Sequence, residues 1–150
     1  MSYFICRKST PDDCSGVYEL ICELEAVRFP YDRFSQIYAG QNSDSRYCCL
    51  VCEKDSEIVA VLNLRFENQL HHCSCIAEII EFVVAAPYRG HGIGKDMFDR
   101  AVNAAREAGC TRIELATNQV RKNAHRFYER MGMKHTHYTY TMDICTSRSV

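Results

Sequence analysis

The 150-residue sequence lacks several features that would exclude a compact cytoplasmic protein. Its formal net charge at pH 7 is −1, and without a basic surplus we predict no nucleic-acid partner. No run approaches the ~20 apolar residues of a membrane-spanning helix, so we predict no membrane partner. The start, Met1–Arg7, has no basic stretch followed by an apolar run, so we expect no signal peptide and a cytoplasmic location.

Internal repeats, low-complexity tracts and linkers are also missing, and the length is about that of one domain. Nearly half of the residues are apolar (47%), which is enough for a hydrophobic core. We therefore predict a single domain over residues 1–150, in which the polar segment 143–150 is a frayed tail.

Cysteine, in contrast, is abundant, with ten residues. Without a secretory signal, these cysteines are expected to be free thiols rather than a disulfide framework. Cys73 and Cys75 lie beside His71 and His72, which is compatible either with a metal site or with strand residues that alternate with period two. Zinc-binding cysteine pairs usually have longer spacings and a second pair, so we predict no metal site.

Apolar periodicity and turn residues predict a series of strands and helices. A helix is expected to start at Thr10 and Pro11, which suit a cap and a first turn, and to end at Pro30. The other expected helices are Asp32–Ala39, Gly92–Ala108 and Lys122–Met131. The expected strands are Tyr3–Arg7, Tyr47–Glu53, Ile58–Glu67, Ser74–Val84, Arg112–Thr117 and His135–Met142. The order β-α-α-β-β-β-α-β-α-β predicts one mixed α/β (α+β) domain.

The segment Val83–Lys95 runs from a strand through a glycine-rich turn into a helix. Glycines allow close approach to a backbone, and a helix N-terminus offers free N–H groups with a partial positive charge. Together with the charges of Arg89 and Lys95, these features predict a pyrophosphate-binding loop, although a tight turn without a ligand remains the alternative. A Walker loop would need glycine at Arg89 and Ser or Thr at Asp96, and a dinucleotide loop would need glycine at Lys95.

The pattern Arg89-x-x-Gly92-x-Gly94 resembles the coenzyme A-binding signature of the GNAT (Gcn5-related) N-acetyltransferase superfamily. The later segment Asn118–Tyr128 also fits this family, and the resemblance extends to about Met142. It implies a GNAT-like fold, with a central mixed, mostly antiparallel sheet flanked by helices, and acetyl-CoA as cosubstrate. Expected acetyl-CoA-binding residues are Phe82, Val83, Val84, Arg89, Gly90, His91, Gly92, Ile93, Gly94, Lys95, Asn118, Asn123 and Phe127.

Three further segments, Val17–Leu24, Leu70–His72 and Ala124–Tyr128, look like the aminoalkylphosphonate N-acetyltransferases of bacterial phosphonate metabolism. This resemblance implies a small-molecule amine as the acceptor, with aminoglycosides or polyamines as other small amines to consider. An acetyltransferase of protein amines and a catalytically silent acetyl-CoA sensor are the alternatives. Many superfamily members are dimers, so a homodimer is an expectation from the resemblance.

Two acids interrupt the apolar strand that precedes the loop, and either could deprotonate the amine. Glu78 is ranked first because it lies eleven residues before Arg89, where many superfamily members carry their catalytic glutamate, and Glu81 is ranked second. Spacing three places the two acids on opposite faces of an ideal strand, which one bulge would change.

Tyr128 matches the general-acid tyrosine of the family and is expected to hydrogen-bond the departing thiolate. A phosphonate or carboxylate on the acceptor would need cationic partners. The candidates are Arg28, Arg33, Arg46, Arg65, His71 and His72.

Overall fold

The structure is a computed structural model that describes residues 3–145. It divides into two compact units, Met1–Leu115 and Ala116–Val150, which we describe separately. Residues 143–145 of the predicted tail have no regular secondary structure, and residues 146–150 lie outside the described part. None of the described helices is long and apolar enough to cross a membrane.

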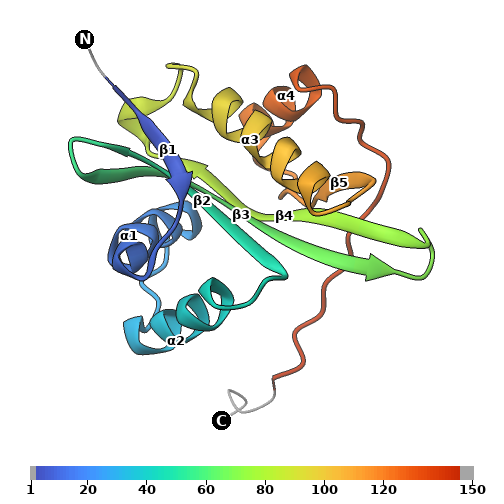
Figure 1. The fold of residues 1–150 in the computed structure, drawn as a ribbon, viewed down its shortest axis with the longest axis horizontal. Coiled ribbons are helices and arrows are strands. Elements are labelled where there is room, and N and C mark those ends of the chain that lie inside the picture. The colour runs from blue at the N-terminus through green and yellow to red at the C-terminus, as the bar shows by residue number, and fades with distance from the viewer. Residues whose placement is uncertain (1–2, 146–150) are drawn as a thin grey trace. The chain divides into compact units, whose positions relative to one another are not determined.

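The first unit contains a five-stranded sheet, which is mixed and mostly antiparallel as predicted but has one strand fewer than the six expected (Figure 1). Its strands, in both chain and spatial order, are β1 (Ile5–Lys8), β2 (Tyr47–Lys54), β3 (Glu57–Gln69), β4 (Ser74–Val84) and β5 (Arg112–Leu115). Neighbouring strands from β1 to β4 are antiparallel, whereas β4 and β5 are parallel. The parallel pair is joined by a helix, as parallel neighbours require.

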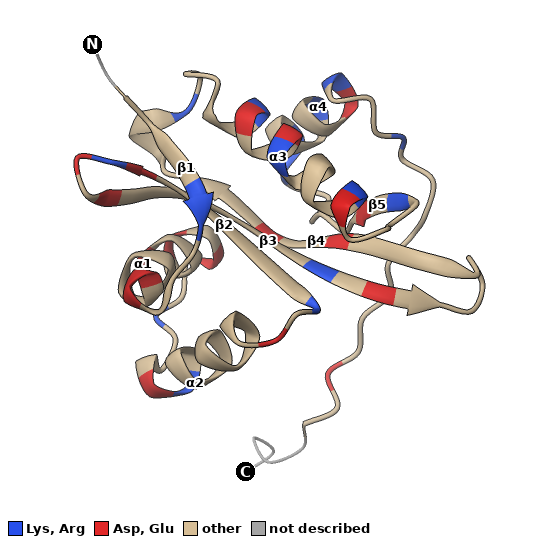
Figure 2. Cartoon of the chain, viewed as in Figure 1, with Lys and Arg blue, Asp and Glu red and all other residues tan. Residues whose placement is uncertain are grey.

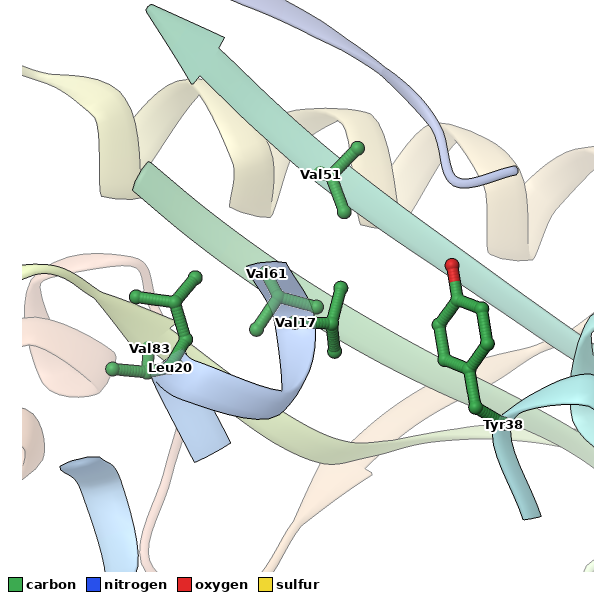
Figure 3. Packing of buried hydrophobic residues seen from close by; sticks show 6 residues of the cluster. All are labelled: Val17, Leu20, Tyr38, Val51, Val61 and Val83. Atoms are coloured by element: carbon green, nitrogen blue, oxygen red, sulfur yellow. The ribbon is translucent and has the colours of Figure 1, made fainter. Parts of the chain in front are cut away.

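Three helices enclose this sheet: α1 (Cys14–Glu25), α2 (Tyr31–Asn42) and α3 (Ile93–Glu107). The first two lie on one face and α3 lies on the other (Figure 1). On the α1 and α2 face, a buried cluster joins Val17, Leu20, Tyr38, Val51, Val61 and Val83 (Figure 3). On the other face, α3 buries the stripe Ile93, Met97, Phe98, Ala101 and Ala105 at helical spacing.

Two helix ends differ from the prediction. The short turn Pro11–Asp13 leads into α1, which ends at Glu25 rather than at Pro30. Ala26 adopts the left-handed conformation (φ 53°) and its N–H bonds back to the carbonyls of the last turn, so the helix is closed before the proline. The helix α2 continues past Gly40 because a helix interior tolerates glycine at a cost of about 1 kcal/mol.

The second unit contains α4 (Lys122–Arg130), which ends before Gly132 (φ 92°), as predicted. The predicted strand His135–Met142 is wrong, because residues 133–145 have no regular secondary structure. Strand propensity reflects packing on a half-buried pleated surface. Tyr138 and Tyr140 are 81% and 93% exposed, so the alternating residues have no such surface.

Candidate active site

A bulge in β4 sets the positions of the two candidate bases. Asn63 on β3 is paired with Glu81, but the next residue, Leu64, is paired with Ile79. Ile80 is therefore an extra residue in β4 with no partner in the ladder register. A bulge of this kind shifts the alternation of side chains by one position along the strand.

The consequence is that both acids lie on one face of the sheet. Arg65 is paired with Glu78, and it is two residues from Asn63, which is paired with Glu81. Residues two apart on a strand share a face, and so do directly opposed residues. The bulge therefore brings Glu78 and Glu81 to the same face, although they are three residues apart in the sequence.

Glu81 is half-buried and accepts a hydrogen bond from Asn63, whose Nδ2 lies 2.9 Å from Glu81 Oε1. Burial raises the pKa of the Glu81 carboxyl, and the hydrogen bond from Asn63 acts in the opposite direction. The carboxylates of Glu25 and Glu78 add to the rise in this pKa. The result is a carboxylate whose pKa is raised toward the range in which a base works.

Glu78 has a different partner. Its Oε1 accepts a hydrogen bond of 2.6 Å from Arg65 Nη2, and the two side chains are about one-third exposed. On the other side of β4, Glu78 is the register partner of Glu114 in β5. The charge of Glu78 is thus balanced by the Arg65 guanidinium. At this position β4 is paired with β3 on one side and with β5 on the other.

A cleft of ≈ 930 Å³ within the first unit reaches Glu81. Its lining on the α1 and α2 face includes Phe34, Tyr38, Gln41, Cys49, Asn63 and Glu81. Burial raises the pKa of Tyr38 to about 12 and that of Cys49 to about 11, so both are neutral at pH 7. The cleft lining also contains charged side chains, namely Arg7, Lys8, Asp44, Arg100 and Glu107.

Beyond the bulge, β4 continues after its pairing with β5 has ended. The β4–β5 ladder runs from Ile76–Arg112 to Ile79–Leu115, whereas β4 itself extends to Val84. From Ile80 onward β4 therefore has no ladder partner in β5, which is shorter than the predicted Arg112–Thr117 because it stops at Leu115. Phe82, Val83 and Val84 lie on the part of β4 beyond the ladder.

The glycine loop follows β4 directly and leads into α3. Gly90 and Gly92 have φ values of 80° and 84°, which favour glycine because other residues are strained there. The first helical bond runs from the Asp96 N–H to the Gly92 carbonyl (3.1 Å). The N–H groups from Gly92 to Lys95 therefore have no acceptor within the helix, as the predicted phosphate site requires.

Two cations of the loop make contacts of their own. Arg89 Nε donates to the Val84 carbonyl (2.8 Å), which ties the loop to the end of β4. Lys95 Nζ pairs with Asp99 (2.9 Å), so its charge is partly balanced along the helix. Positive and negative side chains are interspersed along α3 (Figure 2). His91 is exposed, whereas Ile93 is buried against the core and positions the start of the helix.

The remaining predicted residues belong to the second unit. Asn118 Oδ1 accepts from the Val120 N–H (3.0 Å), and the Asn123 side chain accepts from Arg126. Phe127 and Tyr128 are half-buried, with their rings edge to face and centroids 5.6 Å apart. Burial raises the pKa of the Tyr128 phenol, so it is protonated at pH 7.

Of the six cationic candidates for the acceptor, Arg65 lies on the sheet face of Glu81. Three others make exposed contacts elsewhere: Arg28 with Glu19, Arg33 with Gln36 and Arg46 with Asp44. His71 and His72 lie in the β3–β4 turn with ring centroids 4.2 Å apart, and His72 lies 3.6 Å from Glu114.

The cysteines are free thiols, and residues 3–145 contain no cluster of three or more metal-ligating side chains. Two polar cleft residues escaped the prediction, Asn63 and Gln41. Asn63 has a detectable signal, since it interrupts the apolar run Ile58–Leu64. Gln41 has none, because a glutamine on a half-exposed helix is ordinary.

The sequence is similar to those of known acetyltransferases. The model of a family described as "Acetyltransferase (GNAT) family" matches residues 15–133. The chain is 38% identical over 135 residues to the aminoalkylphosphonate N-acetyltransferase of Salmonella typhimurium, and the match covers 90% of this chain and 88% of the relative.

Solved structures are similar over most of the chain. A structure titled as a transcriptional regulator from Bacillus halodurans has a TM-score of 0.87 at 25% identity, covering 95% of this chain and all of the other. The aminoglycoside N-acetyltransferase AAC(6′)-Iy, solved in complex with CoA, has a TM-score of 0.86 at 12% identity, covering 96% of each chain. At 12% identity this likeness shows the fold alone.

Proposed function

Because the chain belongs to the GNAT acetyltransferase family, we propose that it transfers the acetyl group of acetyl-CoA to the primary amine of an aminoalkylphosphonate. The observation that carries this proposal is Glu81. It is a half-buried carboxylate with a raised pKa, in a cleft, at the point where β4 leaves β5. The named relative from Salmonella typhimurium supports the choice of acceptor.

Acetyl-CoA is proposed to bind along the end of β4 and the glycine loop. The N–H groups from Gly92 to Lys95 would hold the pyrophosphate, helped by the partial positive charge of the α3 N-terminus. The pantetheine arm would run beside Phe82–Val84, beyond the last β4–β5 pair, as an added strand does. Asn118, Asn123 and Phe127 remain proposed contacts for this arm.

Glu81 is proposed to take the proton of the acceptor ammonium, directly or through one water molecule. An alkyl ammonium has a pKa of about 10, so only about one molecule in a thousand is a free amine at pH 7. A positioned base of raised pKa contributes roughly 10²–10⁴-fold to the rate. Glu78 is the weaker candidate because the Arg65 guanidinium already holds its carboxylate.

The free amine then attacks the thioester carbonyl, so that an N–C bond forms and the C–S bond breaks. The second proton of the amine nitrogen is released to the departing thiolate, directly or through water, which gives the amide and the CoA thiol. Backbone N–H groups at Phe82–Val84 would stabilise the oxyanion. Tyr128 would donate a hydrogen bond to the departing thiolate. Full proton transfer from Tyr128 is unfavourable, since a thiol has a pKa of about 8.5 and burial raises that of the phenol above its usual value of about 10.

Arg65 is proposed to bind the phosphonate group. It lies diagonally across the strands from Glu81, and such neighbours are separated by roughly 7–8 Å. A short alkyl chain between amine and phosphonate suits this separation. The Arg65 side chain is 38% exposed, so its guanidinium remains accessible to a ligand although Nη2 is bound to Glu78.

The test is acetyl-CoA turnover, measured as thiol release, with aminoalkylphosphonates, polyamines, aminoglycosides and short peptides as acceptors. The proposal expects the highest kcat/KM with an aminoalkylphosphonate and a lower value with the matching alkylamine that lacks the phosphonate. Turnover confined to peptides would replace the small molecule by a protein amine. Absence of turnover with every amine would contradict the proposal.

A further inference from the structure

Asn63 and Gln41 form a buried hydrogen-bonded connection between α2 and Glu81. Asn63 is 8% exposed, and its Nδ2 donates to Glu81 Oε1 (2.9 Å) and to Gln41 Oε1 (3.0 Å). An amide nitrogen has two hydrogens, so these two bonds use its full donor capacity. The three side chains therefore form one chain that runs from a helix, through β3, to the candidate base on β4.

The direction of these bonds depends on the charge of Glu81. An ionised carboxylate accepts hydrogen bonds and donates none, so the amide must turn Nδ2 toward Glu81. Gln41 must then present its own oxygen to the second hydrogen of Asn63. A proton on Glu81 Oε1 would remove one acceptor, so this arrangement favours the ionised carboxylate.

The oxygen of the Asn63 amide, Oδ1, gives a second argument for a functional role of this residue. Within residues 3–145, Asn63 Oδ1 is buried without a hydrogen-bond partner. A buried acceptor that is left unpaired destabilises the fold, and an apolar residue of the same size would avoid this cost. A residue that served packing alone is therefore not expected to be an asparagine here.

We propose that Asn63, held by Gln41, is a positioning residue that keeps Glu81 ionised and leaves its Oε2 to receive the proton of the acceptor amine. This proposal rests on the proposed function, in which Glu81 is the base. Since Gln41 lies on α2 and lines the acceptor cleft, the helix that walls the cleft also orients the base.

Several groups other than the amides act on the same carboxylate. The carboxylates of Glu25 on α1 and Glu78 on β4 oppose its ionisation, as does its burial. Cys49 on β2 is the register neighbour of Asn63 and is neutral, because burial raises its pKa to about 11. The donated bond from Asn63 works against these effects, so its loss is expected to move the titration of Glu81 to higher pH.

The experiment compares Asn63→Leu with Asn68→Leu, which makes the same substitution at an exposed position of the same strand. Asn63→Leu is expected to shift the acid limb of kcat/KM upward by about one pH unit. Its rate should return toward that of the wild type above the shifted limb. Asn68→Leu should leave the limb in place.

A role in packing alone would instead lower the rate of Asn63→Leu equally at every pH, and an unmoved limb would overturn the proposal. Gln41→Met provides a second variant that removes the distal acceptor while keeping Asn63. It is expected to shift the limb in the same direction by a smaller amount. If Asn63→Leu does not fold, the limb of Gln41→Met decides the outcome.

A readout without substrate separates this proposal from the proposed function. The pKa of Glu81 is measured by ¹³C NMR of labelled glutamate in the ligand-free protein, with the resonance assigned by its loss in Glu81→Gln. A higher pKa in Asn63→Leu supports the role of Asn63 even if no amine is acetylated. An unchanged pKa in both variants, with an active wild type, overturns that role and leaves the proposed function standing.

Discussion

The two halves of β4 carry similar residues but give their glutamates different surroundings. Before the bulge, Glu78 lies between two paired strands and binds the Arg65 guanidinium at 2.6 Å. After the bulge, Glu81 lies beyond the β5 ladder, in a cleft, and binds a neutral amide. Both acids face the same side of the sheet, so the difference comes from their partners and burial.

This difference shows how one extra residue in a strand can separate two roles. The Arg65 guanidinium occupies an oxygen of the Glu78 carboxylate, which suits a structural or binding role. Burial beside an amide leaves the charged form costly, so the carboxylate binds a proton more readily. We therefore propose that the base is Glu81, in the half of β4 beyond the bulge.

The largest expected effect is on catalysis by Glu81→Gln. Gln retains the size of the side chain and can still accept from Asn63, but it cannot take a proton. We expect kcat/KM at pH 7 to fall by roughly 10²–10⁴-fold, measured by thiol release with saturating acetyl-CoA. The matched change Glu78→Gln should lower kcat/KM by less than about tenfold. Equal losses of kcat/KM in the two variants would contradict the different roles that we propose for Glu78 and Glu81.

The second prediction concerns the loop that continues the second half of β4. Gly92→Val places a β-branched residue at φ 84°, where nothing lies within 4 Å of the new Cβ, so the strain comes from the backbone. Strain of about 1–3 kcal/mol is expected to distort the loop and weaken acetyl-CoA binding by roughly 10–100-fold, measured by calorimetry.

Gly109→Val is the control for that variant, because Gly109 has nearly the same φ (81°) but lies beyond the C-terminal end of α3. It should lower stability to a similar extent and leave the affinity for acetyl-CoA unchanged. The same loss of affinity in both variants would mean that general destabilisation, and not the loop, is responsible.

The third prediction tests whether the first half of β4 serves the acceptor. Arg65→Gln removes the cation that we propose binds the phosphonate, and Glu78 loses its partner with it. We expect KM for an aminoalkylphosphonate to rise about tenfold, which corresponds to about 1.4 kcal/mol. This free energy is slightly below the ~1.5–3 kcal/mol of a hydrogen bond to a charged group. KM for the matching alkylamine should change little. A parallel rise for both acceptors would assign Arg65 to the fold instead.

The smallest expected effect is on stability. The pKa of Glu81 is raised in the folded protein, so this acid opposes folding above its folded pKa, and the opposition fades as pH falls through that pKa. Glu81→Gln is therefore expected to raise Tm at pH 7, where 1 kcal/mol corresponds to about 2–4 °C. The gain should vanish at low pH in thermal scans. A lower Tm at pH 7 would mean that the Glu81 charge stabilises the fold.

Much of the fold could be predicted from the sequence because its periodic elements are strong. The strand Ser74–Val84 has the predicted bounds, and α2, α3 and α4 begin and end within a few residues of the predicted positions. The last strand failed because residues 135–142 show strand propensity without a buried surface to pack on. The end of α1 was predicted at Pro30 and is wrong, because the left-handed conformation of Ala26 that closes the helix has no signature in the sequence.

The geometry of the glycine loop was predictable because local chemistry defines it. Glycines at positive φ and a helix start give the loop directly from Gly90, Gly92 and the residues that follow. The ranking of Glu78 before Glu81 stays a prediction, and our proposal of Glu81 depends on the register at Ile80, which the sequence does not reveal. The contribution of Gln41 depends on a tertiary contact between α2 and β3, which spacing along the chain does not reveal.

The pH dependence of kcat/KM in Glu81→Gln and Glu78→Gln tests the central claim most directly. In the wild type, the rate should fall as pH drops through the raised pKa of Glu81, because protonation removes the base. We predict that this acid limb disappears in Glu81→Gln and persists in Glu78→Gln. An acid limb that persists in Glu81→Gln and disappears in Glu78→Gln would contradict the assignment of the base.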